Sequence, residues 1–298
     1  ILLQKGIPQV DTMKKNIILL TFTFTLFLIS FSSCKKEAPA SILNSSEQET
    51  TFELSADQAI ADNLTEDANG IFMEAAAKNN LLGNGVNGQT IVTTNLLSNA
   101  IVTISQTAGF PKTISIDFGS SGSTTANGIT HKGKINVVLS DSVRKTGSTS
   151  IISFTNYFIN NYKKEGTITC TNTSTSSTKA WQRKVSDGKI TAPDGRYWLQ
   201  NGTRDVVQID GTLTPCNLMD DVYLLTGNQS ITNANGKTRN SFITEALQKH
   251  SDCDNIGSGK LKVEGANHYA IINFGNGDCD KIATISIDGN EPRIIQLH

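Results

Sequence analysis

The chain has 298 residues and a formal net charge of −1 at pH 7, so it has neither the basic surplus of a nucleic-acid-binding protein nor an acidic tail for a polybasic partner. Aromatic residues make up only 6% and charged residues 18% of the chain, while Ser, Thr, Asn and Gly are plentiful. Because Thr favours strands and Asn and Gly favour tight turns, this composition favours a β-sheet protein over a helical one.

Residues 13–33 have the pattern of a secretion signal. Met13 is followed by Lys14 and Lys15, and residues 17–31 are uncharged and mostly apolar. As a helix this stretch would rise roughly 22 Å, which is less than the roughly 30 Å of a bilayer core. The pattern therefore favours a removable signal peptide over a permanent span. Residues 1–12 precede the expected natural start, and we treat them as a non-native upstream segment.

Cys34 follows the small residues Ser32 and Ser33 directly. This pattern resembles the lipobox of Bacteroidota lipoproteins, although Phe31 is bulkier than the usual residue at its position. We expect cleavage before Cys34, transfer of a diacylglycerol to its thiol, and a mature chain 34–298 held in the outer membrane of the cell envelope by its acyl chains. The membrane leaflet is left open, and the alternative is a secreted protein in which Cys34 is incidental.

The mature chain divides by its hydrophobic pattern. Residues 34–54 are expected to form a flexible tether, and 55–88 a helical segment in which Ser55 pairs with Gln58 as a cap and Gly70 divides the helix. From residue 89 the period falls to two, with Asn-Gly and Asp-Gly turns at short intervals. Since no long helical pattern intervenes, we predict a mainly β fold of antiparallel meander sheets over 89–298, with a short N-terminal helical segment.

An internal repeat suggests two related β modules. Residues 116–122 (IDFGSSG) are similar to residues 272–278 (INFGNGD), and each stretch lies between two alternating segments. A duplication would give sub-modules of about 89–211 and 212–298. The alternative is a chance recurrence of one turn motif in a glycine-rich chain.

A family resemblance rests on the C-terminal part. Residues 225–230 (LTGNQS), 235–237 (NGK) and 274–284 (FGNGDCDKIAT), together with the strand pattern at 117–119 and 133–135, resemble a group of uncharacterised Bacteroidota envelope lipoproteins that end in an FGxGxCD turn and a final strand. The resemblance extends over most of 55–298. The resemblance implies a location in the cell envelope and a fold, and it implies no activity.

With Cys34 assigned to lipid, four cysteines remain, and an even number outside the cytoplasm predicts disulfides. Cys253 and Cys279 are separated by about two strands and their turns, so we pair them; Cys170 and Cys216 then pair by elimination. A zinc site is the alternative, but no CxxC or CxxH spacing supports it. Acids flank one predicted pair and would converge on a calcium ion if the bridge forms: Asp252, Asp254, Asp278 and Asp280. The simpler interpretation is that these acids are solvated, and no metal or other cofactor is predicted.

Aromatic residues concentrate between residues 154 and 198. Trp181, Tyr197 and Trp198 would stack on sugar rings if they lay exposed in a row, or would form a core if they were buried. No pattern nominates a catalytic nucleophile. The leading hypothesis is therefore a lipid-anchored, non-enzymatic module that binds a glycan or an envelope protein. The alternatives are an enzyme that acts on glycosides or peptidoglycan through paired carboxylates, and a calcium-stabilised structural module.

Overall fold

The computed structural model describes residues 40–83, 86, 89–105 and 108–297, which lie in one compact unit. The predicted signal peptide, Cys34 and the first residues of the predicted tether lie outside the described residues. The elements are α1 (Ala40–Lys78), β1 (Ile101–Ser105), β2 (Lys112–Asp117), β3 (Ser123–Thr124), β4 (Thr130–Leu139), β5 (Thr149–Ile159), β6 (Tyr162–Asn172), β7 (Lys179–Thr191), β8 (Tyr197–Asp210), β9 (Val222–Asn233), β10 (Thr238–His250), β11 (Ser258–Glu264), β12 (Tyr269–Asn276), β13 (Ile282–Ile287) and β14 (Arg293–Gln296).

The strands form one antiparallel meander of 14 strands, which confirms the predicted fold class. Each strand pairs with the next along the chain, except that the short β3 pairs only with β4 at one side of the main path. The two ends of this path are β1 and β14. The sheet does not separate near residue 211, because β8 and β9 on either side of that point are paired from Trp198–Asn233 to Asp210–Val222. The two similar turn sequences therefore belong to one sheet, at β2 and β12.

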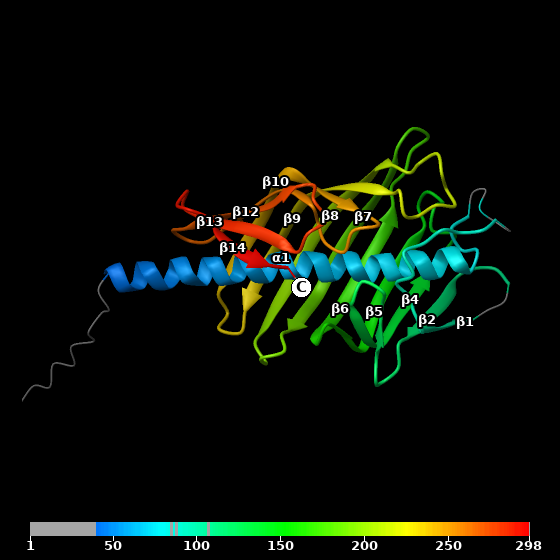
Figure 1. Cartoon of the computed structure of the whole chain (residues 1–298), viewed down its shortest axis with the longest axis horizontal. Coiled ribbons are helices and arrows are strands. Elements are labelled where there is room, and N and C mark those ends of the chain that lie inside the picture. Colours follow the sequence, from blue (N-terminus) through cyan, green and yellow to red (C-terminus); the bar gives the residue numbers. More distant parts are fainter. Residues whose placement is uncertain (1–39, 84–85, 87–88, 106–107, 298) are drawn as a thin grey trace, which may run out of the picture. The chain divides into compact units, whose positions relative to one another are not determined.

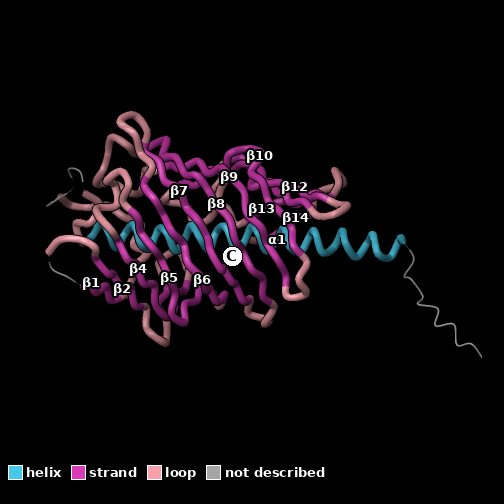
Figure 2. The backbone as a smooth tube through the Cα atoms, turned by 180° about the vertical axis from the view of Figure 1, so that it is seen from behind, coloured by secondary structure: helices cyan, strands magenta, loops and turns pink. Residues whose placement is uncertain are grey.

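The helix α1 lies across one face of this sheet. It runs in front of the strands in Figure 1, and the strands run in front of it in Figure 2, which is seen from behind. Alternate strand residues face the helix and are buried, as the predicted period of two requires. Ala61, Ala68, Ala75 and Ala76 are fully buried on the helix, and their small side chains allow α1 to approach the sheet closely.

The helix differs from its prediction at both ends of the predicted range. It begins at Ala40, so the prediction of a flexible tether is wrong for residues 40–54, and it ends at Lys78. The early turns carry polar residues rather than an apolar stripe, because their partners on the sheet are also polar: Glu47 pairs with Lys237 and Arg239, and Gln48 bonds Asp288. A periodicity argument based on apolar residues could not find such a segment.

Gly70 does not divide the helix. A Cβ atom at this position would lie 3.0 Å from Cδ1 of Leu96, so the glycine makes room for the loop that follows α1. Its cost in helix propensity, about 1 kcal/mol relative to Ala, is offset by packing on both sides.

Glycines in β-bulges bend the strands around the helix. Gly133 interrupts the β4–β5 register, and Gly166 interrupts the β6–β7 register. Their φ angles are +80° and +98°, and an added Cβ would lie 2.0 Å and 2.4 Å from carbonyl oxygens of the neighbouring strand. Bulges increase local twist and bend a strand, which curves the sheet toward the face that α1 covers. In the described ranges, no helix combines the length and apolarity needed to cross a membrane.

Candidate functional site

The contact between α1 and the sheet contains a layer of buried polar pairs. Glu66 pairs with Arg183 on β7, Asp62 pairs with Arg204 on β8, and Gln58 bonds Gln229 on β9. The helix positions are four residues apart, roughly 6 Å along the axis, and neighbouring strands are roughly 4.8 Å apart. Because α1 crosses the sheet obliquely, residues one helical turn apart lie over neighbouring strands. Each acid or amide therefore has its partner on a different strand.

Further pairs extend this layer in both directions. Asp67 accepts from His131 at 3.0 Å, Lys164 donates to Thr65 at 3.0 Å, and Arg196 reaches Asp57 at 3.4 Å. The Lys164 amine is buried, and this burial lowers its pKa to about 8, against the attraction of Asp62, Asp67 and Glu66. The buried charges of α1 are thus met almost one for one by charges from the strands, as buried charges require.

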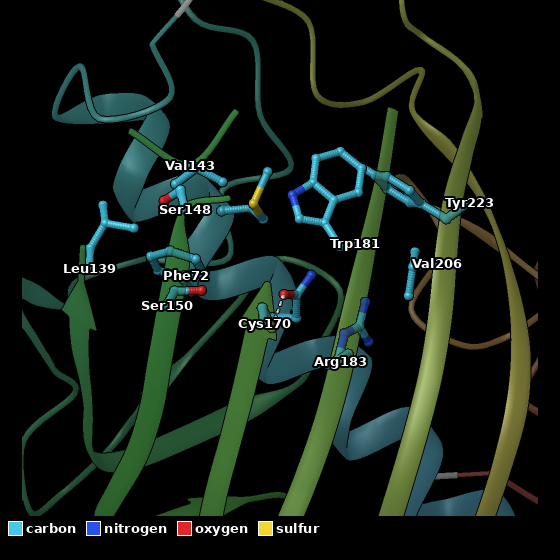
Figure 3. A pocket seen from close by; sticks show the side chains of 12 residues that line it. Phe72, Leu139, Val143, Ser148, Ser150, Cys170, Trp181, Arg183, Val206 and Tyr223 are labelled. Atoms are coloured by element: carbon cyan, nitrogen blue, oxygen red, sulfur yellow. Dashed lines mark hydrogen bonds between the residues drawn. The ribbon is translucent and has the colours of Figure 1, made fainter. Parts of the chain in front are cut away.

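A small cavity, here called the inner cavity, lies between α1 and strands β4 to β9, with a volume of about 30 Å³. Leu139, Ser150, Cys170 and Arg183 follow one another across four paired strands and form its floor. Phe72 of α1 closes it on the helix side, and Trp181, Val206 and Tyr223 close it on another (Figure 3). Met73 of α1 also lines it. The lining of this cavity is mainly apolar, with a few polar groups that converge on it.

Trp181 and Tyr223 form an aromatic pair at the side of this cavity. Their ring centroids are 6.2 Å apart at an interplanar angle of 74°, a T-shaped arrangement. The indole nitrogen of Trp181 is buried and has no hydrogen-bond partner among the described residues, and Figure 3 shows it directed toward the middle of the cavity. A buried donor without a partner is uncommon in native structures, and the indole nitrogen of Trp198 is a second example among the described residues.

A second cavity, here called the acidic cavity, adjoins the first and has a volume of about 240 Å³. It lies between the C-terminal half of α1 and the loops at 93–96, 126–127, 218–221 and 251–254. Six carboxylates and one amine line it: Glu66, Asp67, Glu74, Asp221, Asp252, Asp254 and Lys249. Asn69, Met73 and Tyr223 line both cavities and separate them.

Asp221 links the acidic cavity to the aromatic pair. Its carboxylate accepts a hydrogen bond from the Tyr223 hydroxyl at 2.8 Å and another from the Gln208 amide at 2.6 Å. Burial raises the pKa of Asp221 to about 7, and the nearby Asp220 and Asp210 act in the same direction, whereas Tyr223 and Arg144 oppose the rise.

Lys249 is the one basic residue in the lining of the acidic cavity. Its ammonium donates to the carbonyl oxygens of His250, at 2.8 Å, and Cys253. Burial lowers the pKa of Lys249, while Glu66, Asp67, Asp254 and Asp252 oppose that shift. Because its donors are directed at the 250–253 turn, Lys249 holds the loop in place and reduces the negative charge of the cavity only in part.

The predicted aromatic platform does not form. Trp198 is fully buried beneath α1, in an edge contact with Tyr162, and Tyr197 lies on the opposite face of the sheet under the ammonium of Lys189. Trp181 pairs with Val206, eight positions along β8 from Trp198, or roughly 26 Å. Of the three predicted rings, only Trp181 therefore reaches a cavity.

The cysteines confirm one predicted bridge and correct the other. Cys253 and Cys279 are joined, with their Cα atoms 5.5 Å apart. The predicted Cys170–Cys216 bridge is wrong, because both residues are free thiols. Cys170 faces the inner cavity from β6, and Cys216 lies in the loop before β9, where its thiol meets the side-chain oxygen of Gln89. Elimination failed because it assumed that every remaining cysteine is paired.

The acids beside the bridge do not assemble as a calcium site would require. In the part of the chain that the structure describes, no three His, Cys, Asp or Glu side chains are placed to hold a metal ion. Asp252 and Asp254 line the acidic cavity, whereas Asp278 and Asp280 lie exposed in the turn before β13. Asp254 lies 3.9 Å from the ammonium of Lys281 and also accepts from Asn127, and Asp280 accepts from the amide of Ile282 at 3.1 Å.

Comparisons with known proteins add no relative. No family matches the chain, and neither the curated proteins nor the solved structures contain a match.

The residues that make this site carry no motif. Asp221, Tyr223 and Lys249 come from a loop, a strand start and a strand end, and only the fold brings them to α1. One signal was present: acids recur at positions 62, 66 and 74 of a helix that is otherwise rich in alanine. Acids on the same side as buried alanines indicate that this side meets bases on another element.

Proposed function

We propose that the protein is a lipid-anchored, non-enzymatic binding module of the cell envelope, and that its ligand occupies the acidic and inner cavities. The observation that carries this proposal is the pair of adjoining cavities beside Trp181 and Tyr223. The N-terminal lipidation pattern supports attachment to a membrane. The near-neutral net charge of the chain gives no support for a nucleic-acid partner. A small envelope glycan or an exposed group of an envelope protein fits the mixture of rings and polar side chains.

The test is a titration of residues 35–298 with fragments of envelope glycans and with peptides, in which binding is measured by Trp fluorescence and by calorimetry. Trp181→Phe removes the unpartnered indole donor and should weaken binding. Tyr197→Phe changes an aromatic residue on the opposite face and should leave binding unchanged. Equal loss in both variants, or no loss in Trp181→Phe, would place the ligand elsewhere and overturn the proposal.

A second candidate function is favoured by Asp221 alone. Burial raises the pKa of this carboxyl group to about 7 in a cavity that also contains Glu66 and Asp67, and a raised pKa is what the general acid of a glycoside hydrolase requires. A panel of glycoside and peptidoglycan substrates distinguishes the two functions. Turnover that disappears in Asp221→Asn would replace the binding module by an enzyme.

A further inference from the structure

The acidic and inner cavities are neighbours with different chemistry. Six carboxylates and one lysine line the larger cavity, and apolar side chains dominate the walls of the smaller one. Three residues separate them, and one of these is Met73, an unbranched and flexible side chain that can repack around a ligand. A ligand that enters the acidic cavity can therefore place an apolar end against Met73 and Trp181.

The charge of the acidic cavity is only partly neutralised by the protein. Glu66 has Arg183 and Glu74 has Lys78 as ion-pair partners, and Asp67 has His131. Asp254 lies 3.9 Å from the ammonium of Lys281, and Arg144 attracts the carboxylate of Asp221. The two hydrogen bonds that reach this carboxylate come from the neutral donors Tyr223 and Gln208, and among the described residues Asp252 has no ion pair. The lining itself therefore has more carboxylates than basic groups, six to one, which opposes an anion and favours a cation.

We infer that the ligand of this site is an organic amine, with its ammonium group in the acidic cavity beside Asp221 and its apolar or aromatic part against Met73, Trp181 and Tyr223. This inference rests on the proposed function and narrows it to one class of ligand. A bare metal ion fits less well, because no three ligating side chains converge among the described residues. An ammonium group needs only one or two carboxylates, and Asp221 and Asp252 both line the cavity.

The inner cavity limits the size of the apolar part. Its volume of about 30 Å³ is enough for one or two small groups. An aromatic ring must therefore either remain at the boundary with Met73 or displace its side chain. A short spacer between the ring and the ammonium group matches this arrangement, because Tyr223 lines both cavities and also bonds Asp221.

Three probes of nearly equal shape and different charge test the inference: 2-phenylethylamine, 2-phenylethanol and phenylacetate. Each is titrated into residues 35–298 by calorimetry and by Trp fluorescence. We expect the amine to bind, the alcohol to bind about 10-fold more weakly and phenylacetate not to bind, because one lost ionic contact costs about that factor. Asp221→Asn should reduce the affinity for the amine by a similar factor.

The control variant is Asp205→Asn, which changes an exposed acid on the opposite face of the sheet and should leave the affinity unchanged. Equal binding of the amine and the alcohol, or no binding of the amine up to about 10 mM, the weak range expected of so small a ligand, overturns the inference. If Trp181→Phe then still weakens binding of another ligand, the proposed function stands and only the ligand class is wrong. If no ligand responds to Trp181→Phe or Asp221→Asn in a normally folded chain, both fail.

Discussion

Asp62 of α1 and Arg204 of β8 form an ion pair of 3.1 Å in which both side chains are almost completely buried. Gln58, one turn earlier, donates a further hydrogen bond to Asp62, and Arg204 also donates to the carbonyl of Gly227. Helix and sheet are therefore held together by specific polar contacts as well as by apolar packing. Such contacts favour one register, because a shift of one turn would bring the neutral Gln58 to Arg204 or the neutral Gln229 to Asp62.

Removing one member of this pair should be costly. Asp62→Ala leaves the Arg204 guanidinium buried without its acid, and we expect a loss of about 3–5 kcal/mol in the free energy of unfolding, measured in urea. The matched control is Glu49→Ala, which removes an exposed pair with Arg293 and should cost no more than about 1 kcal/mol. The double variant Asp62→Leu, Arg204→Met should recover most of the loss. Similar costs for Asp62→Ala and Glu49→Ala would contradict the role given to the buried layer.

Asp57 should make stability depend on pH. Burial raises its pKa to about 7 from an ordinary value of 3.8, although Arg196 opposes the rise. The folded state therefore binds a proton more tightly than the unfolded state, so this contribution is fully present below pH 3.8 and is lost as the pH rises through about 7. The difference between the folded and unfolded pKa values corresponds to a contribution of up to about 4 kcal/mol to the free energy of unfolding.

Urea unfolding of the wild type and of Asp57→Asn at several pH values between these limits measures this contribution. The difference in unfolding free energy between the two proteins should change steadily with pH in favour of the wild type at the acidic end. A difference that is constant across the range would show that Asp57 is ionised throughout.

The disulfide should contribute substantially to stability. Cys253 and Cys279 close a loop with a sequence separation of 26, for which chain entropy predicts roughly 3–4 kcal/mol. The variant with both residues changed to Ser should lose about this amount. In unfolded, unreduced residues 35–298, a thiol assay should detect Cys170 and Cys216 and no others. If the assay detected no thiols, the predicted Cys170–Cys216 bridge would be present after all.

Gly133 should tolerate no side chain. An added Cβ would lie 2.0 Å from the carbonyl oxygen of Asn156, in addition to the strain of a positive φ, so Gly133→Ala should cost more than about 2 kcal/mol. Gly128 also has a positive φ, +86°, but has open space at the Cβ position, so Gly128→Ala should cost only about 1–2 kcal/mol. Thermal or urea unfolding compares the two. Equal costs would mean that the close approach of β4 and β5 is not a constraint.

The lipid anchor is tested at Cys34. Expression of the chain from Met13 in a bacterium with lipoprotein processing, in the presence of labelled palmitate, should give a labelled protein in the membrane fraction. Cys34→Ala should abolish the label and leave an uncleaved or released protein. Label that persists in Cys34→Ala would remove the lipoprotein assignment.

The sequence by itself determined the class of the fold. Alternating residues such as Ile114, Ile116 and Phe118, together with Asn-Gly and Asp-Gly turns, specify antiparallel neighbours, since both signals are local and have a fixed period. The Cys253–Cys279 bridge could also be predicted from the sequence, because its two cysteines flank neighbouring hairpins. The extent of α1 was not, because its first turns are stabilised by Lys237, Arg239 and Asp288, which lie far along the chain in β10 and in turns of the sheet.

Only the tertiary structure decided the site. Trp181 and Trp198 have the same residue type and lie on the same face of the sheet, yet one lines a cavity and the other is fully buried. Asp221, Tyr223 and Lys249 meet Glu66 and Asp67 across more than 150 residues of chain. Side-chain periodicity carries information about the face that a residue occupies, and carries none about which distant element covers that face.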